Sequence, residues 1–304
     1  MASLLSLKRR IQAAQNVSKT TRALQMIAAS KMKRAQEAAL NARPYVAKVT
    51  EMTVAAISKA GENFSHPYIT KNADTEKSLV IVVSPDKGLC GGLITTLLKE
   101  FYTYHKEHKN DDYVVIGRKL ESYGARSGEN IIANFLFGTS TPTFDMVYPL
   151  ARLIDDNYSS GKVSSVKVIY THFDSIFSQK PRVETLLPFS KEMVKETNDE
   201  KVSLGGAKSD AAISQPEAVE YMYEPAVTEL LPSLLKHTVE MRLFQFLLES
   251  FVSEQGARMI AMQNATDNAN DIIAAYRLEY NKTRQAKITG EILDLGSGAA
   301  MVNN

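Results

Sequence analysis

The first part of the chain, residues 1–60, has the hydrophobic pattern of a long helix. It contains no glycine and one proline, Pro44, and it is rich in Ala, Lys, Arg, Gln and Met, which favour helices. A heptad grid places on one stripe Leu4, Leu7, Ile11, Ala14, Ser18, Thr21, Gln25, Ala28, Met32, Ala35, Ala39, Ala42, Val46, Val49 and Ala56. Because the middle of this stripe is small or polar, a partner helix can approach closely. We predict a coiled-coil helix that Pro44 kinks or interrupts.

A second long helical pattern occupies the end of the chain, residues 226–304. Pro232 is a start signal for a helix that runs from Ser233 to about Leu295. Its heptad stripe consists of Val239, Leu243, Phe246, Ala257, Ile260, Ala274, Leu278, Ile288, Ile292 and Leu295, and it is broken by Asn264, Asp267 and Asp271. At 1.5 Å per residue the helix is roughly 90 Å long, more than the width of a compact domain. The two terminal helices are therefore expected to pair as an antiparallel coiled coil and to project together as a shaft.

Between the helices, a linker at 61–77 leads into a segment, 78–225, in which strand and helix patterns alternate. The expected strands are "SLVIVVS" (78–84), "DYVVIG" (112–117), "VSSVKVIYTHF" (163–173) and, less clearly, "RVETLLPF" (182–189). The expected helices are "LITTLLKEFYTYHKEH" (93–108), "RKLESYGARS" (118–127) and "TFDMVYPLARLIDDNY" (143–158), which Pro149 disturbs. This alternation predicts a Rossmann-like α/β domain with a largely parallel sheet. Residues 190–216 are polar and poorly patterned.

The charge of the chain is unevenly distributed. Its net charge is only +2, so the chain as a whole does not resemble a nucleic-acid-binding protein. Residues 1–43, however, contain nine basic residues and a single acid, Glu37, which indicates a local acidic partner. Cys90 is the only cysteine, so neither an internal disulfide nor a cysteine-rich metal site can form. No apolar run approaches the roughly 18 residues of a membrane span, and no secretory signal precedes the first helix.

Candidate catalytic chemistry is weak. The turn "SPDKGLCGG" after the first strand lacks the Gly-x-x-x-x-Gly-Lys-Ser/Thr pattern that cradles phosphates, and we interpret its glycines as a tight strand-to-helix turn. Cys90 as a nucleophile, activated by His105, His108 or His172, remains an alternative that makes the chain an enzyme. The five histidines show no metal-site spacing. The pairs Asp111–Asp112 and Asp155–Asp156 are expected to be helix-end or loop acids. We expect no cofactor.

Two terminal stretches carry a specific resemblance. They are "RIQAAQNVSKTTRALQMIAASKMKRAQ" (10–36) and "SEQGARMIAMQNATDNANDIIAAYRLEYNKTRQAKITGEILDLGSGAAM" (253–301), and together with "DKGLCGG" and "EYMYEP" (220–225) they resemble the gamma subunit of F-type ATP synthases. The resemblance implies a non-catalytic rotor, the central stalk, whose paired helices turn inside a ring of three alpha and three beta subunits. Its α/β base sits on the membrane-embedded c-ring, and ion flow through that ring drives the rotation that makes ATP. The implied partners are this alpha/beta hexamer, the c-ring and an epsilon-type (or delta-type) stalk subunit, with one copy of the chain per complex.

The resemblance also assigns contact residues. Arg284 and Gln285 match a pair that hydrogen-bonds a loop of the beta subunit, and Thr289 and Glu291 match further positions of that contact. On the first helix, Lys31 and Arg34 match basic positions that face an acidic beta-subunit loop, and Leu24 matches a family position beside that contact. Tyr221, Tyr223 and Glu224 match residues near the polar loops of the c-ring. The tip "LDLGSGAAM" (293–301) matches the end that turns in an apolar collar, and Gly290, Gly296 and Gly298 weaken helix formation there.

Two alternatives and a location complete these expectations. A free-standing coiled-coil scaffold is the alternative to the rotor, besides the enzyme that uses Cys90. The single cysteine excludes the paired-cysteine redox switch of chloroplast relatives. Since no transit leader precedes the first helix, we expect a peripheral protein on the cytoplasmic face of a bacterial plasma membrane, attached only through its complex. The alternative location is the matrix side of the mitochondrial inner membrane.

Overall fold

The computed structural model describes most of the chain, which its internal contacts divide into two units. The described residues are 3–61, 64–70, 75–127, 130–136, 138–189 and 221–302, without the side chains of 124–127 and 294–302. One unit, here called the helix-pair unit, consists of Met1–Ile27 and Met259–Asn304. The other, Ala28–Arg258, is called the α/β unit. Whether the two form a shaft on a base, and whether domain boundaries lie at 60, 77 and 225, stay predictions.

The two long helices are α1, Leu4–Ala60, and α6, Val227–Val302. The prediction that Pro44 interrupts the first helix is wrong, because α1 continues through it at the cost of one backbone hydrogen bond. Pro232 does not start the second helix either, since α6 begins five residues earlier at Val227. None of the described helices contains an apolar stretch of the length that a membrane span requires.

A five-stranded sheet lies at the centre of the α/β unit. Its strands are β1 Ser78–Val83, β2 Asp112–Ile116, β3 Ile131–Phe135, β4 Ser165–Phe173 and β5 Gln179–Leu187, in the order β3-β2-β1-β4-β5. All pairings are parallel except that of β4 with β5, so the expected largely parallel sheet, including the uncertain fourth strand, is confirmed. The strand β3 was not predicted from the sequence, because this short edge strand is exposed at alternate positions and contains the polar Asn134.

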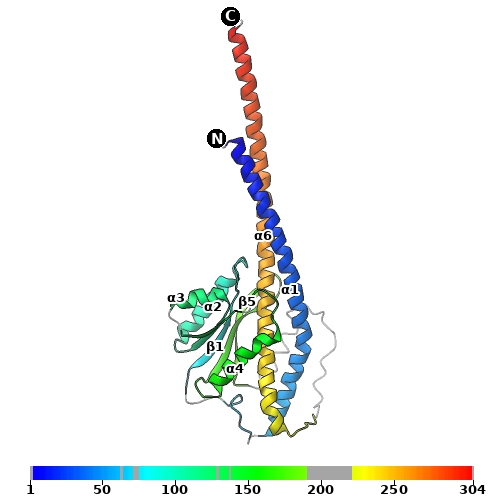
Figure 1. Cartoon of the computed structure of the whole chain (residues 1–304), viewed down its shortest axis with the longest axis vertical. Coiled ribbons are helices and arrows are strands. Elements are labelled where there is room, and N and C mark those ends of the chain that lie inside the picture. The colour runs from blue at the N-terminus through cyan, green and yellow to red at the C-terminus, as the bar shows by residue number, and fades with distance from the viewer. Residues whose placement is uncertain are drawn as a thin grey trace. The chain divides into compact units, whose positions relative to one another are not determined.

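Helices cover both faces of the sheet (Figure 1). They are α2 Leu93–Glu107, α3 Arg118–Ser127, the single 3-10 turn η1 Phe144–Met146 and α4 Val147–Tyr158. One face of the sheet packs on α4, α6 and the end of α1, with Tyr170 and Phe246 in this core. The opposite face packs on α2 and α3 through a smaller cluster that includes Phe101 and Tyr113. Pro149 is tolerated because it lies in the first turn of α4, where a backbone N–H has no helical partner.

Within the helix-pair unit, α1 and α6 lie side by side and run antiparallel (Figure 1). Thr21 and Thr266 share a hydrogen bond of 2.7 Å between their hydroxyl oxygens, and Ser18 donates to Asn270 over 2.9 Å. The stripe predicted on α1 is buried or half-buried along its whole length in both units. The antiparallel pairing and the small or polar centre of its seam are therefore confirmed.

The stripe predicted on α6 is only partly correct. Val239 and Phe246 are buried in the α/β unit, but Asp267, Ala274 and Leu278 are exposed. The buried positions of α6 in the helix-pair unit are Met262, Thr266, Ala269 and Ile273. A heptad grid assumes 3.5 residues per turn, whereas a straight helix has 3.6 and drifts by about 20° per heptad. Over five heptads this drift amounts to about one residue toward the C-terminus. It therefore explains part of the error observed, because the buried positions lie two residues after the predicted positions 260, 264, 267 and 271.

Asp155 near the end of α4 connects three elements and makes the α/β unit sensitive to acid. Its carboxylate accepts hydrogen bonds from Tyr68 at 3.0 Å, Ser159 at 2.9 Å and Lys236 of α6 at 3.2 Å. Burial alone raises the pKa of Asp155, but these hydrogen bonds outweigh it and the net pKa lies below its ordinary value of 3.8. Asp155 therefore stabilises the fold above its ordinary pKa, and this contribution disappears as the pH falls through the lowered one.

We expect Asp155→Asn to remove part of this acid dependence. Urea unfolding at pH 7 and at pH 3 should show that the variant is less stable than the unmodified chain at pH 7, with a smaller difference at pH 3. Asp156→Asn, one residue further along α4, is the control. A difference that is the same at both pH values would contradict the role of the Asp155 carboxylate.

Candidate interaction surface

The structure offers little support for the enzyme alternative. Cys90 is buried, and burial raises the pKa of its thiol, although the Arg258 guanidinium partly opposes this shift. A protonated, buried thiol is a poor nucleophile. His105 shares a hydrogen bond with the Tyr113 hydroxyl and His172 with the Glu249 carboxylate, so both imidazoles take part in structural contacts. Among the described residues, no three His, Cys, Asp or Glu side chains are grouped to hold a metal ion.

The acid pairs singled out in the sequence are also structural. Asp111 precedes β2 and accepts hydrogen bonds from the Ser78 backbone N–H and the Tyr104 hydroxyl, both at 2.9 Å. Asp112 forms an ion pair of 2.7 Å with Lys77. Each carboxylate is therefore held by the ends of neighbouring elements.

The glycine-rich turn after β1 presents carbonyl groups rather than amides to its main partner. The Arg258 guanidinium of α6 donates to the carbonyl oxygens of Lys87, at 3.1 Å, and Gly88, at 3.3 Å. It also pairs with the Glu254 carboxylate at 2.6 Å and opposes the rise in the pKa of Glu254 that burial causes. A phosphate-binding loop needs converging N–H groups. This turn instead binds α6 through its backbone carbonyl groups.

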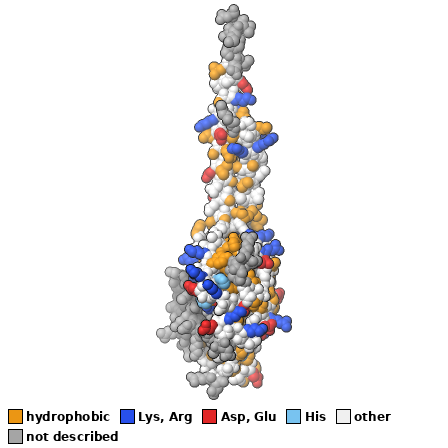
Figure 2. Space-filling model, turned by 90° about the vertical axis from the view of Figure 1, so that its left-hand side faces the viewer, with side chains coloured by type: hydrophobic (Ala, Val, Ile, Leu, Met, Phe, Trp, Pro, Cys, Tyr) orange, Lys and Arg blue, Asp and Glu red, His pale blue; other side chains and the backbone are white. Residues whose placement is uncertain are grey.

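The C-terminal part of α6 has an exposed apolar surface. Residues 281–293 are exposed at every position except Thr283 and Gly290, and in this part of Figure 1 no second helix lies beside α6. Leu278, Ile288 and Ile292 are 58%, 45% and 63% exposed. Figure 2 shows hydrophobic side chains interspersed with charged ones on the visible face of the helix-pair unit. An isolated helix is marginal in water, so such a segment is typical of a helix that packs on other chains.

The four predicted contact residues of this segment differ in their availability. Arg284 and Gln285 are exposed, and their side chains make no hydrogen bond or ion pair with any other described residue. The Thr289 hydroxyl donates to the Gln285 carbonyl oxygen at 3.0 Å, and Glu291 pairs with Lys287 at 3.6 Å. The helix continues to Val302 in spite of its glycines, but side chains beyond Leu293, at the predicted tip, lie outside the described residues.

The predicted contact residues on α1 divide between the two units. Leu24 lies half-buried in the helix-pair unit, whereas Lys31 and Arg34 belong to the α/β unit. The Lys31 ammonium donates to the carbonyl oxygen of Thr139, so it is partly engaged. Arg34 is exposed and unpaired among the described residues. The predicted contact residues on α1 therefore do not all belong to the unit that contains Arg284.

Two of the three predicted c-ring residues, Tyr221 and Tyr223, contact α1. The Tyr221 hydroxyl donates to the Glu51 carboxylate at 2.8 Å, and the Tyr223 hydroxyl donates to the Met52 carbonyl oxygen at 3.3 Å. Lys59 donates to the carbonyl oxygen of Tyr221 at 3.2 Å. Both aromatic side chains therefore help to fix the segment before α6, and only Glu224 is exposed.

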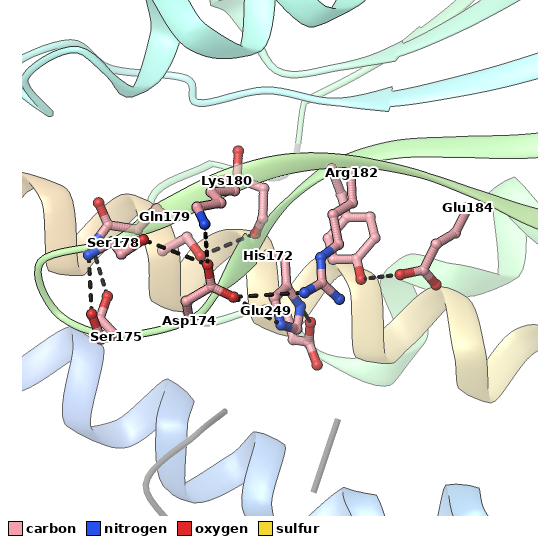
Figure 3. Close-up of polar contacts among 12 residues, drawn as sticks. His172, Asp174, Ser175, Ser178, Gln179, Lys180, Arg182, Glu184 and Glu249 are labelled. Carbon is pink, nitrogen blue, oxygen red and sulfur yellow. Dashed lines mark hydrogen bonds and ion pairs between the residues drawn. The ribbon is translucent and has the colours of Figure 1, made fainter. Parts of the chain in front are cut away.

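A buried ionic cluster joins the sheet to the two long helices within the α/β unit (Figure 3). His172 of β4 and Glu249 of α6 are each 1% exposed and share a hydrogen bond of 2.9 Å. Arg43 of α1 pairs with the other carboxylate oxygen of Glu249 at 3.4 Å. The second imidazole nitrogen of His172 lies 3.6 Å from the Asp174 carboxylate, which also pairs with Arg182 of β5. Three elements are thus connected through one buried carboxylate.

This cluster was not predicted from the sequence. His172 was one of five scattered histidines, and Glu249 was not singled out. A signal did exist, because Glu249 is the one charged residue in the apolar run "LFQFLLESFV" (243–252), and a charge in such a run requires a buried partner. The identity of the partners could not be read from the sequence, since Arg43 is 206 residues away.

Comparison with known proteins agrees with this architecture. The family model described as ATP synthase matches residues 3–302. The chain is 39% identical over 303 residues to the "ATP synthase gamma chain" of Dehalococcoides mccartyi, with 99% of both chains covered. It is 36% identical over 306 residues to that of Cupriavidus metallidurans, with 99% of this chain and 100% of the relative covered.

Solved structures with the same fold come from mitochondrial ATP synthases. A central stalk/c-ring structure from Tetrahymena thermophila has 21% identity and a TM-score of 0.56, with 81% of this chain and 99% of that chain covered. An OSCP/F1/c-ring structure from Euglena gracilis has 16% identity and a TM-score of 0.60, with 98% and 94% covered. By its full-length family match and its bacterial relatives, the chain belongs to the ATP synthase gamma chain family.

Proposed function

We propose that the chain is the central rotor stalk of an F-type ATP synthase and is itself non-catalytic. It would couple ion-driven rotation of a c-ring to the conformational cycle of catalytic beta subunits in an alpha/beta hexamer. The observation that carries this proposal is the exposed C-terminal part of α6, where apolar side chains and the unpaired Arg284 and Gln285 face outward. Such a surface fits a helix enclosed by other subunits.

The proposed mechanism is differential contact. A partner shifts a conformational equilibrium only to the extent that it binds one state better than another. Two antiparallel helices of different sequence present a different face in each direction, so three surrounding beta subunits would meet three different surfaces. One copy of the chain per complex follows from this asymmetry.

We assign the contacts as the sequence motifs suggest. Arg284 and Gln285 would bind a beta-subunit loop, since the guanidinium offers a five-donor fork and the amide both donates and accepts. Thr289 and Glu291 would contribute at its edge. Lys31, Arg34 and Leu24 would contact an acidic beta-subunit loop. Of the three positions assigned to the c-ring, exposed Glu224 would make the direct contact, with Tyr221 and Tyr223 holding its segment on α1.

The buried ionic cluster would transmit torque between the sheet and the long helices. His172, Glu249 and Arg43 connect β4, α6 and α1 by charged contacts with fixed directions. If the α/β base moved relative to the long helices, rotation of the c-ring would no longer be coupled to the beta subunits. Charged contacts with defined geometry would prevent such movement. The base would also bind an epsilon-type stalk subunit, and the whole would lie peripherally at the cytoplasmic face of a bacterial plasma membrane.

The test is the double variant Arg284→Ala plus Gln285→Ala in a complex reconstituted from the full chain with its alpha and beta subunits. Two lost hydrogen bonds to a partner should lower ATPase activity about tenfold. Lys106→Ala plus Glu107→Ala, two exposed positions at the end of α2, is the control and should leave the activity unchanged. If the unmodified chain forms no ATPase-active complex, a free-standing scaffold becomes the better explanation. Undiminished activity of the Arg284/Gln285 variant would instead remove the assignment of this contact.

A further inference from the structure

A groove lies between α1 and α6 in the helix-pair unit, and none of the residues assigned above is among those that line it. It encloses about 420 Å³ and is lined by Gln15, Ser18 and Lys19 of α1 and by Asn270, Ile273, Ala274 and Arg277 of α6. Its volume is within the range of about 300–1,000 Å³ that is common for ligand clefts. The groove is open to its surroundings, so a side chain of another protein can enter it.

Two cations line this groove without a partner in the described part of the chain. Residues three and four positions from Lys19 are Gln15, Asn16, Arg22 and Ala23, and those around Arg277 are Ile273, Ala274, Tyr280 and Asn281. Neither helix therefore offers an acid at the spacing that forms intrahelical ion pairs. Lys19 and Arg277 also make no other ion pair among the described residues.

The surroundings strengthen the positive charge of the groove. The α1 segment from Leu4 to Ile27 contains five basic residues and no acid. The acids of α6 on either side of the groove are Asp267, Asp271 and Glu279, which are exposed and do not line it. An anionic group would thus meet cations from both helices.

The neutral groups of the groove add donors of hydrogen bonds. The Ser18 hydroxyl donates to the side-chain oxygen of Asn270 at 2.9 Å. This contact occupies the amide oxygen of Asn270 and leaves its NH2 group available to donate. Together with the Lys19 ammonium and the Arg277 guanidinium, the groove presents three donor groups, which matches carboxylate oxygens.

We propose that this groove binds the carboxylate side chains of an acidic segment from a neighbouring subunit. The inference rests on the proposed function, which places other subunits around the helix pair. A planar guanidinium can hold one carboxylate through two hydrogen bonds, while the ammonium of Lys19 holds it or a second one as a point charge. Exposed charge pairs of this kind are weak and salt-sensitive, which suits a contact that forms and breaks during rotation.

Zero-length crosslinking tests the occupant directly. In the reconstituted complex with alpha and beta subunits, a water-soluble carbodiimide activates a carboxyl group as an O-acylisourea. The Lys19 amine attacks the acyl carbon, an amide bond forms, and the urea leaves. Peptide mass spectrometry should then find Lys19 joined to an Asp or Glu of a neighbouring subunit in the complex, and no such product with the chain alone. An ATPase-active complex in which Lys19 remains uncrosslinked would overturn the groove assignment, whereas failure to form an active complex would count against the proposed function instead.

A charge variant gives a second, independent measurement. Lys19→Gln plus Arg277→Gln should speed dissociation of the chain from the complex about fivefold at roughly 0.1 M salt, and this excess should shrink as the salt concentration rises. The matched control is Lys109→Gln plus Arg118→Gln, which removes the same charge from exposed positions of the α/β unit and should change dissociation less than about twofold. Equal effects of the two variants would overturn the proposal. Binding of inorganic phosphate to the isolated chain, abolished by the groove variant, would also overturn it, because the groove would then be a small-anion site.

Discussion

Glu249→Ala is expected to lower the free energy of unfolding by about 3–5 kcal/mol, the usual cost of removing one partner of a buried ion pair. The variant leaves His172 without the partner of its 2.9 Å hydrogen bond and Arg43 without its carboxylate. Arg43 then lies against α6 with no compensating charge, and His172 keeps only the Asp174 carboxylate, 3.6 Å away, so the contact between the sheet and the long helices weakens. Urea unfolding of the purified full chain, followed by circular dichroism, measures the change.

Two further variants separate the loss of charge from the loss of volume. Glu249→Gln keeps the shape and one acceptor oxygen, so it should cost less than Glu249→Ala. His172→Ala combined with Glu249→Ala should cost less than the sum of the single changes, because the two side chains interact directly. Glu249→Ala within about 0.5 kcal/mol of the unmodified chain would show that the cluster does not hold the sheet and the long helices together.

Gly117→Ala is expected to destabilise the α/β unit by about 3 kcal/mol or more, since two penalties combine. Gly117 follows β2 with a φ of +97°, a conformation that side chains other than glycine rarely adopt. A Cβ atom at this position would also lie 2.0 Å from the carbonyl oxygen of Ser84. Backbone at the end of β1 cannot yield as a flexible side chain can, so the ends of β1 and β2 must separate.

Gly92→Ala is the matched control for this prediction. Gly92 lies on the same rim of the sheet, at the start of α2, with a φ of −81°, and a Cβ atom added there would meet no other atom within 4 Å. It should change stability by less than about 1 kcal/mol. Thermal unfolding of both variants measures the contrast, and a Gly117→Ala chain as stable as Gly92→Ala would mean that the backbone there relaxes freely.

Local residue patterns predicted much of the fold. The absence of glycine before Gly61, the run "SLVIVVS" and the segment "RKLESYGARS" each predicted an element whose position the structure confirms. These signals depend on backbone propensity and on side-chain alternation, which neighbouring residues determine. The edge strand β3 and the start of α6 were less accessible, because burial on one side can stabilise a segment whose own pattern is weak.

The candidate interaction surface could also be predicted only in part from the sequence. The C-terminal motif predicted Arg284 and Gln285 as contact residues. Their exposure on α6 could be expected from the polar stretch "NKTRQAK" (281–287). The hydrogen bonds of Tyr221 and Tyr223 to α1 could not be predicted from the sequence, since their partners lie about 170 positions earlier in the chain. Contacts over such separations depend on how the elements pack.

The sequence by itself determined two long terminal helices, an alternating α/β segment between them and the family resemblance, because each is recorded in residue type and local spacing. Only the tertiary structure decided which face of α6 is buried, that His172, Glu249 and Arg43 share one buried cluster, and that Lys19 and Arg277 line one groove. The physical reason is that a residue pattern identifies the buried face of a helix over a few turns. Along a helix of 76 residues, a small difference between the assumed and the real helical period shifts the predicted buried face. Pairing between distant side chains is then set by packing, which no local pattern encodes.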